Sequence, residues 1–198
     1  MKPRTVKDSA ENIHFKAARR FIAVDVETTG LSTKRGDRII EIGAVVVEGG
    51  SIGEEFHALI SVKERIHWAA QQVHGITEEM LIDKPKADAV MPEFRKFIAD
   101  CSLVAHNARF DMAFISDEFL RLGRGLTNPY QCTLELSRNL YPKLPNHRLE
   151  TVYRHLFGRI PEGTKRHRAL DDARLVAKMW VEMAIKMSQL LDKTNEQR

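Results

Sequence analysis

Cysteine is scarce in this chain of 198 residues, since only Cys101 and Cys132 occur, far apart and without neighbours at metal-ligand spacing. A disulfide-stapled scaffold and a zinc site built on thiolates are therefore excluded, and two isolated thiols suit a reducing compartment. Long apolar runs are missing too, because the first twenty residues carry charges and no uninterrupted apolar core. This excludes a signal peptide or membrane span there. We therefore expect a cytoplasmic protein with no membrane partner.

Internal repeats and low-complexity segments are also absent, and neither glycine nor proline gathers in a linker. With 43% hydrophobic residues, the chain is long enough for one well-packed domain. We expect this domain over residues 21–187, a basic N-terminal extension over residues 1–20 and a polar C-terminal tail over residues 188–198. The formal net charge of +4 permits a polyanionic partner but is too common among soluble proteins to indicate one.

The order of the expected elements indicates an α/β fold. An apolar strand begins at residue 21, and RIIEIGAVVVEGG and SIGEEFHALI then read as two strands joined at Gly49 and Gly50, as in a hairpin. Helical periodicity follows from residue 68 onward, interrupted by a short buried strand at residues 103–105 and an extended piece at NPYQC. This order predicts a mixed sheet, antiparallel over its first three strands and then parallel, flanked by helices.

Two acids interrupt the first strand, in the stretch VDVETTG. Asp25 and Glu27 lie two residues apart, so both carboxylates project to one face while Val24 and Val26 point to the other. No Lys or Arg lies in that run. Two like charges at a half-buried spot repel each other and are poorly solvated, so they either share a proton or need a cation. The alternative is a strand with exposed acids on its outer face.

Further acids follow where the layout returns to the same edge of the sheet. One lies a turn into the helix that follows residues 103–105, and two follow a histidine by about one turn at the start of the last helix. The candidate cluster therefore has four carboxylates: Asp25, Glu27, Asp111 and one of Asp171 or Asp172. Oxygen ligands of this kind favour hard cations such as Mg²⁺ or Mn²⁺ over Zn²⁺.

Several of these residues also have an ordinary structural alternative. Asp111 would suit the first turn of a helix as an exposed acid, because it would favour the macrodipole. His167 lies within KRHR, which reads equally as a solvated basic loop. There Lys165, Arg166 and Arg168 would either attract phosphates or be merely solvated.

Three segments in chain order, VDVETTG, AHNARFD and HRALDDA, resemble the motifs of the DnaQ-like (DEDDh) 3′–5′ exonuclease superfamily. The resemblance extends from about residue 21 to residue 180 and includes RIIEIGAVVV and QQVHGITEEML. These two segments are similar to segments of the proofreading (epsilon) subunits of bacterial replicative polymerases. The resemblance implies a ribonuclease H-like fold and identifies residues 21–187 as an exonuclease domain.

The resemblance also implies an activity and its cofactors. Such an enzyme would release nucleoside 5′-monophosphates from the 3′ end of single-stranded or frayed DNA, using two divalent cations, Mg²⁺ or Mn²⁺. On the matching positions, Asp25 would contact both cations, Glu27 and Asp172 would help to hold the first, and Asp111 would support the second. The second acid of the last motif is preferred to the first because the family has four residues between its histidine and its aspartate.

The same resemblance gives His167 the role of general base, since an unperturbed imidazole pKa near 6.5 allows it to accept a proton around neutral pH. Thr28, Thr29 and Leu31 would meet the 3′ end, with Leu31 between the last two bases. The residues that would line the pocket of the terminal nucleotide are Val73, His74 and Phe110. Core packing is the alternative for the apolar residues, and backbone bonding at a helix end is the alternative for the histidine.

The motifs do not separate DNA from RNA, because that choice depends on contacts to the 2′-hydroxyl. A processing 3′–5′ exoribonuclease is the alternative among enzymes. A non-catalytic nucleic-acid-binding or polymerase-accessory module is the alternative outside them, although a cluster of acids would repel phosphate. About a dozen polar-rich residues follow the last expected helix, in place of the long tail that tethers proofreading subunits to a polymerase. A stand-alone exonuclease is therefore consistent with the sequence, and association with a DNA polymerase stays open.

Overall fold

The structure, a computed structural model, describes residues 20–196, with side chains through residue 190. The N-terminal extension expected over residues 1–20 lies outside the described residues, except for Arg20, which opens the first strand. The last helix continues to Glu196, so most of the segment expected as a polar tail is helical. In the described part of the chain, no helix combines the length and apolar character needed to cross a membrane.

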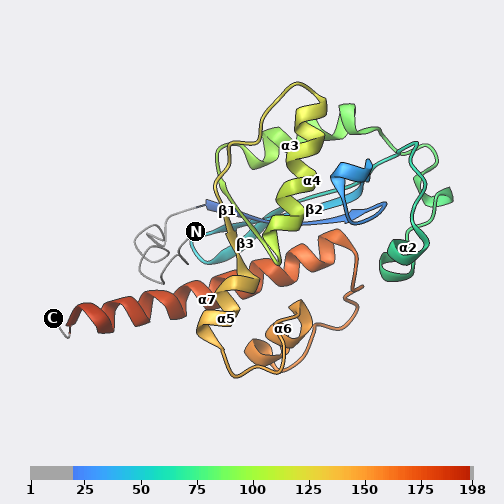
Figure 1. Ribbon diagram of the computed structural model, residues 1–198. Helices are drawn as coiled ribbons and strands as arrows, with labels where there is room; N and C mark the ends of the chain where they lie inside the picture. The colour runs from blue at the N-terminus through green and yellow to red at the C-terminus, as the bar shows by residue number, and fades with distance from the viewer. Residues whose placement is uncertain (1–19, 197–198) are drawn as a thin grey trace.

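A five-stranded mixed sheet forms the centre of the fold (Figure 1). Its strands, in the order β3-β2-β1-β4-β5 across the sheet, are β1 (Arg20–Thr28), β2 (Ile39–Glu48), β3 (Ser51–Leu59), β4 (Ser102–Ala105) and β5 (Tyr130–Cys132). The first three strands pair antiparallel, and β4 and β5 continue parallel to β1. The expected sheet is confirmed. Its hairpin turns at Gly49 and Gly50, whose φ angles of 58° and 79° suit glycine.

Helices cover both faces of this sheet (Figure 1). One face carries α3 (Ala87–Ile98) and α4 (Ala108–Arg121), and the other carries α5 (Thr133–Leu140), α6 (Leu149–Phe157) and α7 (Ala169–Glu196). The side chains of β1 alternate between two cores: Val24 and Val26 pack on the α3 and α4 side, whereas Phe21 and Ala23 pack on the α7 side. This alternation agrees with the sequence prediction and leaves both acids of the strand on the α7 face.

Short elements complete the fold near one end of the sheet. The 3-10 helix η1 (Thr33–Arg35) lies in the loop after β1, and α2 (Trp68–His74) and the 3-10 helix η2 (Glu79–Leu81) follow β3. Ile40, Ile66, Ile76 and Leu81 form a small apolar cluster that fixes these segments to the sheet.

A glycine in β2 sets the position of α7 over the sheet. Gly43 pairs with Asp25 across β1 and β2, and a Cβ atom at Gly43 would lie only 2.3 Å from the backbone of Ala169. A side chain there would therefore push the start of α7 away. The missing side chain brings the first turn of α7 beside Asp25.

Candidate active site

Four carboxylates meet where β1 ends and where α4 and α7 begin. Asp25 and Glu27 come from β1, Asp111 comes from the first turn of α4, and Asp172 comes from the first turn of α7. The last two are 3% and 4% exposed. The backbone N–H of Val26 donates a hydrogen bond of 3.2 Å to Asp111 Oδ1, which ties α4 to β1. The structure thus brings together the acids that the sequence suggested.

Burial and mutual repulsion shift these carboxyl groups toward the protonated state. Burial raises the pKa of Asp25 well above its usual value, and the charges of Asp111 and Asp172 raise it further. The pKa of Glu27 rises to about 8, first through burial and then through the charge of Asp172. Burial also raises the pKa of Asp111 to about 8. Near neutral pH such a set either holds protons or binds cations, so its oxygen donors fit a divalent metal.

The predicted general base lies at the exposed side of this cluster. One ligand-type atom each from Glu27, His167 and Asp172 lies within 4.8 Å of the other two. The backbone N–H of His167 donates to Asp172 Oδ2 at 3.3 Å, and its φ is 56°. This left-handed conformation is uncommon for a residue other than glycine, and such backbone strain tends to occur at functional sites.

Asp171 has a different set of contacts from its neighbour in the motif. Its Oδ2 accepts a hydrogen bond of 3.0 Å from the backbone N–H of Lys165, and its Oδ1 accepts one of 2.7 Å from Arg174. Arg174 in turn donates two hydrogen bonds, of 2.8 and 2.6 Å, to Glu55 on β3. Asp171 therefore ties the loop before α7 to the sheet, whereas Asp172 faces the other acids.

A further acid, Glu41 on β2, anchors the other side of that loop. Its carboxylate is fully buried and accepts hydrogen bonds of 2.7 to 3.1 Å from the guanidinium of Arg168, and one of 3.1 Å from the N–H of Ala169. His57 Nε2 donates another at 2.7 Å. Burial alone would raise the pKa of Glu41, but His57 and Arg168 lower it to about 2. An acid inside the apolar run RIIEIGAVVV is the signal that could have identified it.

The basic residues around His167 are bound within the protein. Arg166 donates to Asp172 and, at 2.9 Å, to Glu150 in the first turn of α6. Arg168 is the partner of the buried acid on β2. Both guanidinium groups thus position the loop before α7, and of the three cations considered as phosphate contacts only Lys165 is exposed.

A pocket of about 540 Å³ opens beside the acids. Its lining includes Glu27 and five of the six predicted substrate residues: Thr28, Leu31, Val73, His74 and Phe110. Leu31 is 83% exposed and Val73 is 54% exposed, so core packing does not explain them. The pocket volume lies in the range of small-molecule sites.

Thr29 and His74 show how far this prediction agrees with the structure. Thr29 is fully buried behind the pocket, because its N–H donates to the carbonyl of Arg38 at 2.9 Å and its hydroxyl accepts from the N–H of Arg38 at 3.0 Å. His74 Nδ1 accepts a hydrogen bond of 3.0 Å from Ile76, and burial lowers the pKa of this imidazole. His74 is therefore bonded to backbone at the end of α2 and also lines the pocket.

Asp37 and His67 form part of the pocket wall, and no sequence pattern marks them. Asp37 is buried; its Oδ2 accepts a hydrogen bond of 2.8 Å from the N–H of Ser32, and its Oδ1 accepts one of 3.1 Å from His67 Nε2. A Cβ atom at Gly30 would lie 2.5 Å from both side chains. These contacts hold the loop after β1 against the start of α2.

Comparison with known proteins identifies the family of the chain. The model of the RNase T family, described as Exonuclease, matches residues 22–180. The chain belongs to this exonuclease family. The match confirms the resemblance to DnaQ-like exonucleases and the prediction of an enzyme, and exonucleases with these four acidic motif positions are metal-dependent.

Curated relatives of this exonuclease-family chain include two bacterial polymerases. It is 37% identical over 172 residues to "DNA polymerase III PolC-type" of Clostridium perfringens and 39% identical over 201 residues to that of Bacillus subtilis. The alignments cover 87% and 96% of this chain but only 12% and 14% of the relatives. The chain thus matches a small part of each polymerase.

Solved structures of other exonucleases share the fold. "Exonuclease X in complex with 5' overhanging duplex DNA" has a TM-score of 0.68 and 29% identity, and the match covers 84% of this chain and 91% of that one. The zinc-bound E. coli ExoI–ssDNA complex has a TM-score of 0.74 over 89% of this chain and 43% of its own. At 20% identity, the second likeness supports the fold alone.

Proposed function

We propose that this chain is a 3′–5′ exonuclease that releases nucleoside 5′-monophosphates from the 3′ end of single-stranded or frayed DNA, with two divalent cations, Mg²⁺ or Mn²⁺, as cofactors. The observation that carries the proposal is the cluster of four buried or half-buried carboxylates with raised pKa values beside a pocket of about 540 Å³. Two divalent cations fit this donor set, because their charge balances that of four ionised carboxylates.

The proposed roles of the acids are those that the resemblance to the exonuclease motifs implies. Asp25 would contact both cations, Glu27 and Asp172 would complete the first site, and Asp111 would support the second. When bound, the cations supply Lewis acidity, which lowers the pKa of an attacking water and neutralises charge on the phosphoryl oxygens. Arg166 keeps Asp172 oriented toward the cluster by its ion pair.

The histidine and the pocket serve the substrate. His167 would accept the proton of the attacking water, because its imidazole lies at the exposed side of the acids. The terminal nucleotide would occupy the pocket against Phe110, Val73 and His74, with Leu31 between the last two bases. The backbone of Thr28 would contact the terminal nucleotide. Thr29 would hold the loop after β1 in place through its hydrogen bonds to the backbone of Arg38.

The names of the related proteins support DNA as the substrate. One related structure is described as a complex with duplex DNA that has a 5′ overhang, and the curated relatives are named as DNA polymerases. We therefore infer that the 3′ ends of newly made DNA are the natural substrate, either within a polymerase assembly or with the exonuclease acting alone.

A cleavage assay with matched strands tests this proposal. Purified protein is given 5′-labelled single-stranded DNA or RNA of one sequence, with Mg²⁺, with Mn²⁺ or with chelator. We expect a metal-dependent ladder that shortens from the 3′ end, faster on DNA. Faster shortening of the RNA strand would show that RNA, and not DNA, is the preferred substrate. Binding of both strands without shortening under any metal would overturn the enzymatic proposal.

Two variants distinguish the loss of a proposed metal ligand from the general effect of removing an acid. Asp25→Ala should abolish shortening while strand binding is largely kept, since the strand has contacts outside the metal site. Asp117→Ala is the matched control, because Asp117 lies on α4 beyond Asp111 and pairs with Arg121 by a bond of 2.7 Å on the outer surface. Shortening that survives in the first variant would refute the assignment of the site.

A further inference from the structure

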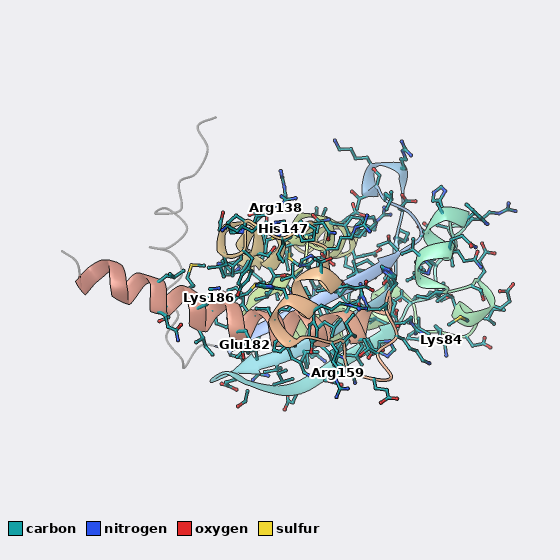
Figure 2. All side chains as sticks on the ribbon, turned by 90° about the horizontal axis from the view of Figure 1, so that it is seen from below. Lys84, Arg138, His147, Arg159, Glu182 and Lys186 are labelled. Atoms are coloured by element: carbon teal, nitrogen blue, oxygen red, sulfur yellow. The ribbon has the colours of Figure 1, made fainter. Side chains whose placement is uncertain are left out.

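The chain segment from the end of α5 to just after α6 is rich in cations, and Glu182 of α7 is an acid that Figure 2 labels on the same side of the molecule. Between residues 138 and 159 the chain has five Arg or Lys residues and a single acid. All five cations are exposed: Arg138, Lys143, Arg148, Arg154 and Arg159. We call these five residues the α6 cationic surface. Figure 2, seen from below, labels Arg138 and Arg159 on this side of the molecule, together with Lys186 on α7.

None of these five cations forms an ion pair within residues 20–190, the part of the chain with described side chains. The single acid of the segment, Glu150, is already the partner of Arg166. Arg38, by contrast, is paired with Glu118. Unpaired cations on one face repel each other and attract a polyanion, so this surface favours a polyanionic partner.

Two contacts connect the α6 cationic surface to the active site. Arg166 binds Asp172 on one side and Glu150, in the first turn of α6, on the other. In addition, Nε2 of His106, just after β4, donates a hydrogen bond of 2.9 Å to the carbonyl oxygen of His147. Arg148, the N-cap residue of α6, follows directly. Glu150, two residues after Arg148, is therefore connected to the carboxylate cluster through one side chain, that of Arg166.

The proposed pocket for the terminal nucleotide lies toward a different side of the carboxylates. It is bounded by α2 and the loop after β1, and α2 and α6 lie on different sides of the start of α7 (Figure 1). A strand whose 3′ end enters the pocket and whose last phosphodiester lies over the acids can therefore continue onto α6. The nine residues of α6 extend about 13 Å, roughly the length of four stacked nucleotides.

We propose that the α6 cationic surface binds the phosphate backbone of the single strand that leads into the active site, upstream of the terminal nucleotide. This inference rests on the proposed function, because it takes the strand to be the substrate. Phosphate contacts carry no sequence information, which suits an enzyme that must remove whichever base comes next. The surface would hold the strand through successive cleavage events.

The test measures how affinity depends on strand length and salt. The variant Arg148→Gln with Arg154→Gln removes two charges from the α6 cationic surface. The matched control is Lys84→Gln with Lys86→Gln, which removes two exposed charges outside the α6 cationic surface; Figure 2 shows Lys84 away from Arg138 and Lys186. Binding of a dinucleotide and of a twelve-nucleotide DNA strand is measured with Ca²⁺ in place of Mg²⁺, over a range of salt concentrations.

We expect the surface variant to bind the long strand about tenfold more weakly than wild type, with a salt slope reduced by about 1.4, because each single-strand phosphate contact contributes about 0.7. The gain in affinity from dinucleotide to long strand should shrink accordingly, and the control should match wild type. Equal losses in surface variant and control, or an unchanged length dependence, would overturn the proposal. An unchanged affinity for DNA together with lost binding of an acidic protein partner would overturn it as well.

The outcome separates this inference from the proposed function. Wild-type cleavage of the dinucleotide with Mg²⁺ reports on the active site without upstream phosphates. If wild type cleaves the dinucleotide and the affinity of the surface variant still depends on strand length as in wild type, only the proposal for the α6 cationic surface fails. If wild type cleaves no strand, the proposed function fails, whatever the binding data show.

Discussion

Glu27 and Glu41 face each other in register across β1 and β2, yet the pKa values of their carboxyl groups lie on opposite sides of the ordinary value. Burial and the charge of Asp172 raise the pKa of Glu27 to about 8. Burial acts on Glu41 as well, but hydrogen bonds from His57 and Arg168 lower its pKa to about 2. The difference shows that hydrogen-bonding and charged neighbours, more than the extent of burial, decide whether a buried acid is ionised.

The same contrast divides the acids around the site into two groups. Glu118 resembles Glu41, because it is buried and receives two hydrogen bonds, of 2.7 and 2.8 Å, from Arg38. These acids have internal cations and hold loops and helices in place. The carboxylate cluster of β1, α4 and α7 has too little positive charge of its own, so it stores repulsion that a bound cation would relieve.

The largest expected effect separates the two groups by activity. Glu27→Gln should lower the rate of DNA cleavage on the order of a thousandfold, because it removes a charged metal ligand. The melting temperature without cations should stay the same or rise, since one repulsive charge is lost. Cleavage kinetics and thermal unfolding of the same preparation check both results. A large drop in melting temperature would place Glu27 in the structural group.

The next largest effect concerns Glu41, which pairs with Glu27 across β1 and β2. Glu41→Gln should reduce the free energy of unfolding on the order of 3 kcal/mol, because Arg168 and His57 would lose their buried carboxylate. Urea unfolding measures this loss. The control is Glu54→Gln, which removes an exposed acid paired with Arg20 at 3.5 Å and should change stability little. If the two variants were equally stable, Glu41 would not belong to a group of acids that stabilise the fold through internal cations.

A smaller effect appears in the pH dependence of stability without cations. Because the folded-state pKa of Glu27 is raised from 4.5 to about 8, the folded chain binds more protons than the unfolded chain in that window. Stability should therefore fall as pH rises from about 4.5 to about 8. Glu41 acts in the opposite sense, since its stabilisation is lost only as pH falls from 4.5 toward 2.

Thermal unfolding across this pH range, with and without Mg²⁺, checks the pH prediction. Added Mg²⁺ should flatten the fall, because the cation replaces the protons on the cluster. This effect of Mg²⁺ on the pH dependence should disappear in Asp25→Ala if the metal binds where we propose. A Mg²⁺ effect that is equal in wild type and in this variant would argue for a different site.

The smallest expected effect tests the loop that carries His167. Asp171→Ala should lower kcat about tenfold with little change in KM, since it releases the backbone N–H of Lys165 and loosens the histidine. Adding His167→Ala to this variant should cost less activity than it does in wild type, because the histidine is already misplaced. Additive losses would show that Asp171 acts independently of the histidine.

Local patterns made much of the site predictable from the sequence. The alternation of a strand has a period of two, so the common face of Asp25 and Glu27 follows from their spacing. The starts of α4 and α7 follow strand and loop signals, which is why Asp111 and one of Asp171 or Asp172 could be assigned to the same edge. The choice of Asp172 came from the resemblance to the exonuclease motifs. Leu31 and Val73 are exposed beside the pocket, as the resemblance to exonucleases implies and as core packing would not allow.

Contacts between distant segments were not predictable in this way. Glu41 and Arg168 are separated by 127 residues, and neither one identifies the other as its partner. The run KRHR shows the same limit, because its arginines read equally well as phosphate contacts in the sequence. In the fold, Arg166 binds Glu150 and Asp172, and Arg168 binds Glu41. Asp37 and His67 meet only because a loop closes over α2.

The sequence by itself determined the family, the order of the strands and helices, and the acids of the candidate metal site, because each depends on spacing along the chain. The tertiary structure alone decided which acids have internal partners and which lack enough positive charge. It also buried Thr29 behind the pocket and connected Glu150 of α6 to the acids through Arg166. Protonation and charge pairing depend on what lies nearby in space, and that proximity arises only when the chain folds.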